Sequence, residues 1–346
     1  MYCGSLNTRQ IATGRFDGQS VLVTGGTGSF GKKFAEIVLK YSNPKRLIVL
    51  SRDEMKQSEM AQQFDHDPRL RFFLGDVRDR DRLHRAFQGV NTVIHAAALK
   101  QVPAAEYNPF EVVKTNIIGA QNIVDVALDA GVSRVVALST DKAANPINLY
   151  GATKLCADKL FVAANSYGGG TGTRFACVRY GNVVGSRGSV IPFFASRRST
   201  GVLPITHPDM TRFWITLDQG VSLVLAAIGW MQGGEIFVPK IPSMKVVDLA
   251  KAVAPECRLE MVGIRPGEKL HEVMIPGDES RNTYEFDTHY LIAPAFHEWS
   301  MADFRSSGGR PVADGFTYSS DGNDHWLTLD ELREMAGEPA VAAREA

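Results

Sequence analysis

The sequence predicts an α/β fold in which a doubly wound parallel sheet is joined to a smaller C-terminal lobe. Two observations support this prediction. Short apolar runs alternate with amphipathic segments of helical period up to about residue 180. After Gly181 the alternation gives way to a stretch dense in Gly, Pro, Arg and Ser, followed by short helical and strand segments. Apolar strands separated by helices are typical of βαβ units, whose parallel sheet is buried on both faces.

Six strands are expected, at residues 21–24, 47–50, 70–74, 92–95, 134–139 and 174–179. Residues 109–130 carry one broad apolar face and predict a single long helix between the fourth and fifth strands. Near the end, Thr328 and Glu331 have the spacing of a capping box that opens a short helix. We divide the chain into an N-terminal extension (1–15), a sheet domain (16–180), a segment that belongs mainly to a substrate-binding lobe (181–296) and a C-terminal segment (297–346).

Composition excludes several classes of partner. The chain has 346 residues with 38 basic and 38 acidic side chains, and no basic stripe that would favour nucleic acid or an anionic membrane. Its longest apolar segment, residues 221–231, is shorter than the roughly 20 residues of a membrane-spanning helix and predicts a buried helix instead. The four cysteines lack paired spacing, so neither a disulfide framework nor a metal site is expected. These features predict a soluble, cytoplasmic protein.

A glycine-rich turn follows the first strand and opens the first long helix. Gly25, Gly28 and Gly31 have G-x-x-G-x-x-G spacing, with Thr27, Ser29 and Phe30 between them. A pyrophosphate site needs a tight turn, close backbone approach and amide groups at a helix N-terminus. A glycine-rich turn alone is weak evidence, but its place between strand and helix favours dinucleotide binding. The sheet domain is therefore predicted to be of the Rossmann type.

The residues after the second strand bear on which dinucleotide binds. Ser51-Arg52-Asp53 stands where an NAD enzyme usually offers an acidic residue to the ribose. A hydroxyl and a guanidinium suit the 2′-phosphate of NADP, which we favour. The alternative is that Arg52 is solvated and Asp53 takes the ribose.

The ends of the third and fourth strands supply further cofactor candidates. Asp76 and Val77 are placed to meet the adenine, and Ala96 and Ala97 let the chain run close to the cofactor. The neighbouring His95 is interpreted as structural, and Lys100 faces either a phosphate or solvent.

Candidate catalytic residues follow the fifth strand. Thr140, Asp141 and Lys142 end that strand, and Tyr150 and Lys154 lie four residues apart on one helical face. We expect the lysine ammonium to lower the pKa of the phenol toward neutrality, so that Tyr150 can take a proton from a sugar hydroxyl. The same lysine is expected to hydrogen-bond the nicotinamide ribose.

With these residues in view, the chain resembles the inverting UDP-N-acetylglucosamine 4,6-dehydratases of pseudaminic acid biosynthesis, in the extended short-chain dehydrogenase/reductase family. The matching segments are TGGTGSFGKKF, SRDEMKQSEM, GDVRD, AAALKQVPAAEYNPFE, STDKAANPINLYGATK, RYGNVVGSRGSVIPFF, RPGEKLHEVMI and NDHWLTLDELR. The first 15 or so residues do not match and are either an extension or a cloning remnant. In relatives that act without inversion, Asp-Glu stands where this chain has Asp141-Lys142. In the larger membrane-anchored relatives, Met replaces the tyrosine.

The resemblance implies a redox-neutral reaction on UDP-N-acetylglucosamine with NADP as cofactor, in a homo-oligomer of unspecified size. Tyr150 would start oxidation at carbon 4, Lys142 would remove the carbon 5 proton, and Asp141 would release the 6-hydroxyl as water. For this the pKa of Asp141 must be raised and Lys142 must be able to lose its proton.

The resemblance also implies a nucleotide-sugar site in the C-terminal lobe. Arg265 would meet the diphosphate and Glu268 the uridine ribose. Asn182, Arg187 and Lys100 complete the predicted substrate-binding set, and Arg212 is a weaker candidate. The alternative for each of these residues is a surface salt bridge.

Three rival functions remain open at this point. A nucleotide-sugar 4-epimerase on the same scaffold would use Tyr150 and Lys154 without the Asp141-Lys142 pair. A retaining 4,6-dehydratase would release water without inverting carbon 5. A non-catalytic NADP-binding regulatory protein would bind cofactor without turnover.

Overall fold

The computed structural model describes residues 6–166, 172–185, 190–295 and 301–337, without the side chains of residues 301–303. The predicted α/β fold is confirmed, and all six expected strands are present with ends that agree to within one residue. They are β1 (Ser20–Thr24), β2 (Arg46–Ser51), β3 (Leu70–Leu74), β4 (Thr92–His95), β5 (Arg134–Thr140) and β6 (Arg174–Tyr180). All but β3 have almost wholly buried residues, as expected for strands covered on both faces.

The main sheet extends well beyond these six strands. Among the described residues its order is β16-β14-β15-β10-β6-β5-β4-β1-β2-β3. The added strands are β10 (Ile236–Pro239), β14 (Thr283–Glu285), β15 (His289–Ile292) and β16 (Arg310–Pro311). Strand β10 is parallel to β6, and the next three strands are antiparallel to their neighbours. The order reverses at β1, between β2 and β4, which is the point where folds of this type bind ligands.

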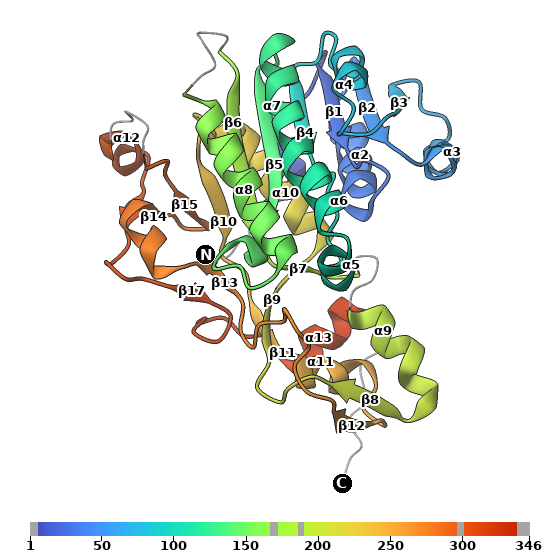
Figure 1. Ribbon diagram of the computed structural model, residues 1–346, viewed down its shortest axis with the longest axis vertical. Helices are drawn as coiled ribbons and strands as arrows, with labels where there is room; N and C mark the ends of the chain where they lie inside the picture. Colours follow the sequence, from blue (N-terminus) through green and yellow to red (C-terminus); the bar gives the residue numbers. More distant parts are fainter. Residues whose placement is uncertain (1–5, 167–171, 186–189, 296–300, 338–346) are drawn as a thin grey trace.

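Helices cover both faces of the sheet (Figure 1). On one face α4 (Arg80–Ala86), α7 (Gly119–Asp129) and α8 (Leu149–Ala164) pack side by side. On the other, α2 (Ser29–Tyr41) packs against α10 (Leu217–Trp230), which contains the predicted buried helix. The helix α3 (Glu54–Gln63) lies next to β2 and β3. No helix within the described residues is long and apolar enough to span a bilayer.

The segment expected to be an N-terminal extension is packed into this core. Helix α1 (Thr8–Ala12) lies against α2 and α10. Ala12 and Phe16 are each only 1% exposed, and the Thr8 and Ser222 hydroxyls lie 2.6 Å apart. Residues 8–16 therefore contribute to the fold, although they lie outside the family pattern.

The predicted long helix over residues 109–130 is interrupted. Helix α6 (Pro109–Val113) runs into a π-helical turn at Lys114–Ile118 before α7 begins. In this turn Asn116 is buried, and its amide bonds both the N–H and the carbonyl of Leu99 (2.9 Å each) and the hydroxyl of Thr153 (3.0 Å). The interruption thus ties the loop after β4 to α8. Wider turns of this kind occur frequently at functional sites.

A second apolar cluster forms the core of the smaller lobe, seen below the sheet in Figure 1. It includes Trp214, Leu249 and Leu332. The elements of this lobe are β7 (Asn182–Val183), α9 (Val190–Arg197), β8 (Val202–Ile205), β9 (Thr211–Ile215), β11 (Ser243–Lys245), α11 (Val246–Val253), β12 (Arg258–Met261) and α13 (Leu329–Ala336). Helix α13 starts at the predicted capping box. The remaining elements are α5 (Val102–Tyr107), β13 (Val273–Ile275), α12 (Met301–Ser306) and β17 (Tyr318–Ser319).

The two cores alternate along the chain. Helix α10 and strand β10 belong to the main sheet region, although they lie within residues 181–296, which the sequence assigns mainly to the smaller lobe. Their neighbours β9 and β11 pair with each other in the smaller lobe. The chain therefore crosses between the two regions several times.

Candidate active site

A cleft of about 710 Å³ runs along the carboxyl ends of the central strands and between the two cores. It brings together nearly all the residues that the sequence singled out: Gly25, Thr27, Gly28, Ser29, Phe30, Ser51, Arg52, Asp53, Asp76, Val77, Ala96, Ala97, Lys100, Thr140, Asp141, Lys142, Tyr150, Lys154, Asn182, Arg212, Arg265 and Glu268. Gly31 does not line the cleft, and Arg187 lies outside the described residues. One continuous site is formed.

The glycine turn has the shape that a dinucleotide needs. Gly25 has φ +64°, and a Cβ there would lie 2.9 Å from the Cα of Ala97. A Cβ on Gly31 would lie 2.2 Å from the carbonyl oxygen of Gly26, so this glycine permits close packing rather than lining the cleft. Helix α2 begins at Gly28 with no side-chain cap, which leaves its first N–H groups open toward the cleft. These residues fit a bound pyrophosphate.

After strands β2 and β3, two carboxylates that line the cleft already have partners. Asp53 caps α3 by accepting a hydrogen bond from Lys56 N (3.0 Å), and it pairs with the Lys56 ammonium, which lowers the pKa of the carboxyl. Both oxygens of Asp76 accept hydrogen bonds from Arg78. Arg52 is 54% exposed and lies 3.7 Å from Asp76 Oδ2. Of these side chains, Arg52 is the one most available to a ligand.

Tyr150 and Lys154 project from the first two turns of α8 into the cleft, and both are buried. The Lys154 ammonium donates to the Leu138 carbonyl (2.7 Å), and burial lowers its pKa. Burial raises the pKa of Tyr150 to about 12, opposed mainly by the charge of Lys142. The expectation that Lys154 brings this pKa toward neutrality is therefore wrong: desolvation dominates, and the nearby charge that opposes it comes from Lys142.

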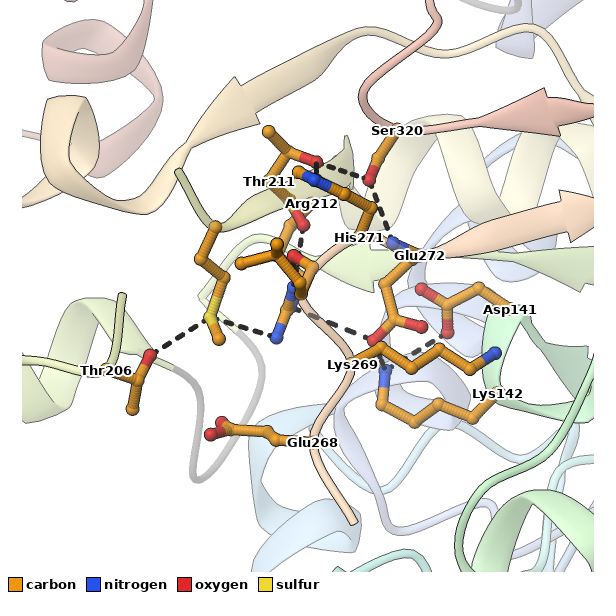
Figure 2. A network of polar contacts seen from close by, with 12 residues as sticks. Asp141, Lys142, Thr206, Thr211, Arg212, Glu268, Lys269, His271, Glu272 and Ser320 are labelled. Atoms are coloured by element: carbon orange, nitrogen blue, oxygen red, sulfur yellow. Dashed lines mark hydrogen bonds and ion pairs between the residues drawn. The ribbon is translucent and has the colours of Figure 1, made fainter. Parts of the chain in front are cut away.

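The predicted acid/base pair forms a buried ionic network with a third residue (Figure 2). Lys142 Nζ lies 3.1 Å from Asp141 Oδ1 and 3.2 Å from Glu272 Oε1. Asp141 is fully buried, and Glu272 is only 2% exposed. Thr140 Oγ1 also donates to Asp141 Oδ1 (2.8 Å). The Lys142 amine is thus held between two carboxylates.

The electrostatics of this network agree with one requirement of the predicted chemistry and oppose another. Burial, together with the charge of Glu272, raises the pKa of Asp141, as a general acid requires. The two carboxylates outweigh desolvation and raise the pKa of Lys142, whereas a general base must be able to lose its proton. The pKa of Glu272 is lowered by Lys142, Arg212 and Lys269, so this residue is the ionised partner.

Comparisons with known proteins agree with this site. The profile of the polysaccharide biosynthesis proteins matches residues 21–294. The UDP-N-acetylglucosamine 4,6-dehydratase (inverting) of Campylobacter jejuni is 54% identical over 328 residues, which cover 92% of this chain and 98% of the relative. The chain belongs to the inverting UDP-N-acetylglucosamine 4,6-dehydratase family. The resemblance inferred from the motifs is confirmed.

Other relatives of this dehydratase-family chain have different names or lack a named reaction. A UDP-glucose 4-epimerase of Rickettsia conorii is 38% identical over 92% of this chain and 96% of its own length. The X-ray structure of Pen from Bacillus thuringiensis is 36% identical and superposes with a TM-score of 0.85, covering 92% of this chain and 97% of that one.

The smaller lobe closes this dehydratase-family site through one loop. Asn148, the N-cap of α8, donates to the Gly267 carbonyl (2.8 Å), and the Lys269 ammonium donates to the Ala144 carbonyl (2.6 Å). Arg265 and Glu268 flank Gly267 and line the cleft, and neither pairs there with another charged side chain in the described part of the chain. Two contacts thus place the predicted substrate residues opposite the Asp141–Lys142 pair.

The sequence does not single out Glu272 in the cleft or Asn116 beside it. Glu272 lies within the family segment RPGEKLHEVMI but carries no other signal. Asn116 falls in the segment predicted as one apolar helix face, and it bonds the loop after β4. Arg212 lines the cleft, yet its guanidinium is already bonded to the Thr211 and Leu270 carbonyls (2.7 and 3.1 Å) and lies 3.8 Å from Glu272.

Proposed function

We propose that this protein converts UDP-N-acetylglucosamine into a 4-keto-6-deoxy product with inverted carbon 5, using NADP without net reduction. The observation that carries the proposal is the juxtaposition of Lys142 and a fully buried Asp141 in the cleft that also holds Tyr150 and Lys154. Family membership supports it, because the relative that is 54% identical has this reaction in its name.

Tyr150 and Lys154 serve the first step. The bound dinucleotide supplies a reversible hydride acceptor. Tyr150 takes the proton of the 4-hydroxyl, and the nearby Lys142 charge lowers the pKa of this phenol against the effect of burial. Lys154 lies on the same helical face as Tyr150 and donates to the Leu138 carbonyl of β5, and we propose that it also binds the nicotinamide ribose.

Lys142 and Asp141 serve the elimination. A ketone at carbon 4 acidifies the carbon 5 proton, which Lys142 removes in its neutral form. Asp141 and Glu272 raise the pKa of Lys142, so this form is the minor one near neutral pH. Asp141 donates its proton to the 6-hydroxyl, which leaves as water. Burial raises the pKa of Asp141, which favours the protonated form that a general acid needs, and its Oδ2 has no hydrogen-bond partner within the described residues.

Arg265 and Glu268 are proposed to hold the UDP moiety, as the family resemblance implies. An arginine makes bidentate, charge-assisted hydrogen bonds to a diphosphate. Asn182 and Lys100 line the same cleft, and Lys100 lies close enough to Lys142 for the two charges to interact. Arg187, also assigned to substrate, stays a prediction from the sequence.

The choice of NADP over NAD rests on Arg52. Asp53 is engaged by the N-terminus of α3 and by Lys56, whereas the half-exposed Arg52 faces the cleft. An arginine in this position suits the 2′-phosphate that distinguishes NADP.

Replacing Arg52 by Ala should therefore weaken NADP binding about tenfold or more and leave NAD binding nearly unchanged, because charge-assisted hydrogen bonds contribute about 1.5–3 kcal/mol. Titration of both dinucleotides by calorimetry measures this. Arg85→Ala, an exposed change on α4 outside the cleft, is the control. An equal loss for both dinucleotides would assign Arg52 a structural role.

A 4-epimerase is the second candidate, because epimerases are found among the relatives at 38% identity. Epimerisation needs the Tyr150 and Lys154 chemistry but no acid for the 6-hydroxyl. A buried Asp141 beside Lys142 favours elimination.

The deciding experiment is incubation with UDP-N-acetylglucosamine and NADP, followed by mass spectrometry and NMR. The expected product has lost one water and shows inverted carbon 5, with no accumulation of reduced dinucleotide. A product with the mass of the substrate would support epimerisation, and loss of water with retained carbon 5 would support the retaining reaction.

A further inference from the structure

Glu272 reaches the acid/base pair from a distant part of the chain. It precedes β13, 130 positions after Lys142, yet its Oε1 lies 3.2 Å from Lys142 Nζ. Its second oxygen, Oε2, is buried and has no hydrogen-bond partner in the part of the chain that the structure describes. A buried carboxylate in this condition is costly unless nearby charges compensate it. We therefore ask which function in the site explains a buried carboxylate at this position.

The backbone of Glu272 is firmly anchored. Its N–H donates to the Ser320 hydroxyl (2.9 Å), and its carbonyl accepts from the Ser320 N–H (2.8 Å). The Ser320 hydroxyl in turn lies 2.6 Å from that of Thr211, which also contacts His271 (2.8 Å). Figure 2 shows this network on the side of Glu272 away from Lys142. The carboxylate is thus presented to Lys142 from a fixed support.

The charges around Glu272 are mostly positive. Among the residues that the structure describes, the titratable groups that interact with the acid/base pair include Lys100 after β4, Tyr150 on α8, Arg212 on β9, and Lys269 and Glu272 before β13. A negative charge among them favours the protonated form of each neighbour. Glu272 acts in this direction on both Asp141 and Lys142.

We propose that Glu272 is a positioning residue for the elimination. Its carboxylate holds the Lys142 amine beside Asp141, and its negative charge stabilises the protonated forms of both groups. This inference rests on the proposed dehydratase function. Lys142 and Asp141 contact the substrate, and Glu272 acts through them.

Glu272 neither gains nor loses a proton during the elimination. The C5–H bond breaks as an N–H bond forms on Lys142, and its electron pair becomes the new carbon–carbon double bond. The C6–O bond breaks as Asp141 gives its proton to the departing oxygen, which leaves as water. Transfer of a proton from the Lys142 ammonium to the Asp141 carboxylate, across 3.1 Å, restores the starting pair. The Glu272 carboxylate stays ionised and stabilises the ammonium that forms.

Glu272→Gln tests the charge while nearly preserving size and shape. Without the negative charge, the pKa values of Lys142 and Asp141 should both fall, so both limbs of the pH–rate profile of water release should move to lower pH. A charge at this range shifts a pKa by about one to three units. Glu272→Asp should restore the wild-type profile in part. A merely structural role would lower the rate at every pH without moving the limbs.

A second measurement needs neither substrate nor cofactor. The pH dependence of Lys142 acetylation in the free protein, followed by mass spectrometry, should shift to lower pH in Glu272→Gln. The control is Glu260→Gln on the exposed strand β12, and circular dichroism checks folding. An unshifted Lys142 titration in a folded Glu272→Gln protein would overturn the inference. Failure of the wild-type protein to release water would instead overturn the proposed function, and the Lys142 titration would still test Glu272.

Discussion

Lys142→Met is expected to abolish the release of water from UDP-N-acetylglucosamine while still permitting oxidation at carbon 4. In the proposed mechanism the amine is the base for the carbon 5 proton, and methionine has a similar length but no amine to accept it. General acid/base groups contribute about 10² to 10⁴ in rate, so the loss should be at least of this order. Exchange of the carbon 5 proton with D₂O should stop. Reduced dinucleotide should still form in a single turnover because Tyr150 and Lys154 remain, but more slowly than in wild type, because the Lys142 charge no longer lowers the pKa of Tyr150.

Lys159→Met, an exposed change later on α8, is the matched control and should behave as wild type. Removal of Lys142 leaves Asp141 and Glu272 without their shared cation, so the thermal unfolding of the variant must be compared with that of wild type. A folded Lys142→Met protein that exchanged the carbon 5 proton at the normal rate would make Lys142 a bystander. The chemical basis for inversion would then be lost.

Tyr150→Phe should lower the rate of oxidation at carbon 4 by about 10² to 10⁴ with dinucleotide binding nearly unchanged, because only the phenolic proton acceptor is removed. The rate of carbon 4 oxidation in wild type should also increase with pH. Burial raises the pKa of this phenol to about 12, so the phenolate is the minor form near neutral pH. While the pH is below the pKa, the phenolate fraction grows about tenfold for each unit by which the pH increases. The single-turnover rate of wild type should rise with it.

The Tyr150→Phe rate should not show this rise. Stopped-flow measurement of dinucleotide reduction over a range of pH provides the test, with the highly exposed Tyr107→Phe as control. If the variant kept both the wild-type rate and its slope with pH, another group would have to take the 4-hydroxyl proton.

Local sequence patterns predicted the parts of the fold that depend on local physics. Strands β1 to β6 are continuous apolar runs, and the turn at Gly25 needs a residue that tolerates positive φ and close approach. The pairing of β10 with β6, and of β15 with β10, depends on contacts between distant segments. Because β10 and β15 are only four residues long, their own pattern does not specify a partner.

In the site, too, the features that depend on local sequence were predictable and those that depend on distant segments were not. The residues following β5 and on α8 were placed correctly in one cleft, because the strand ends and the helix start fix them. The pKa directions could not be predicted, because they depend on burial and on Glu272, which comes from another part of the chain. Arg212 stayed a weaker candidate for ligand binding, because the sequence does not reveal the backbone carbonyls that already bond its guanidinium.

The position of β6 inside the sheet limits how this protein can be divided. A fragment ending near residue 180 would leave β6, six of whose seven residues are buried in the intact protein, as an edge strand without its partner β10. Unprotected edges of this kind invite aggregation by strand pairing between copies. The sheet domain is therefore not an exchangeable module, and exchanging the smaller lobe between relatives requires that β10 stay with the sheet that it completes.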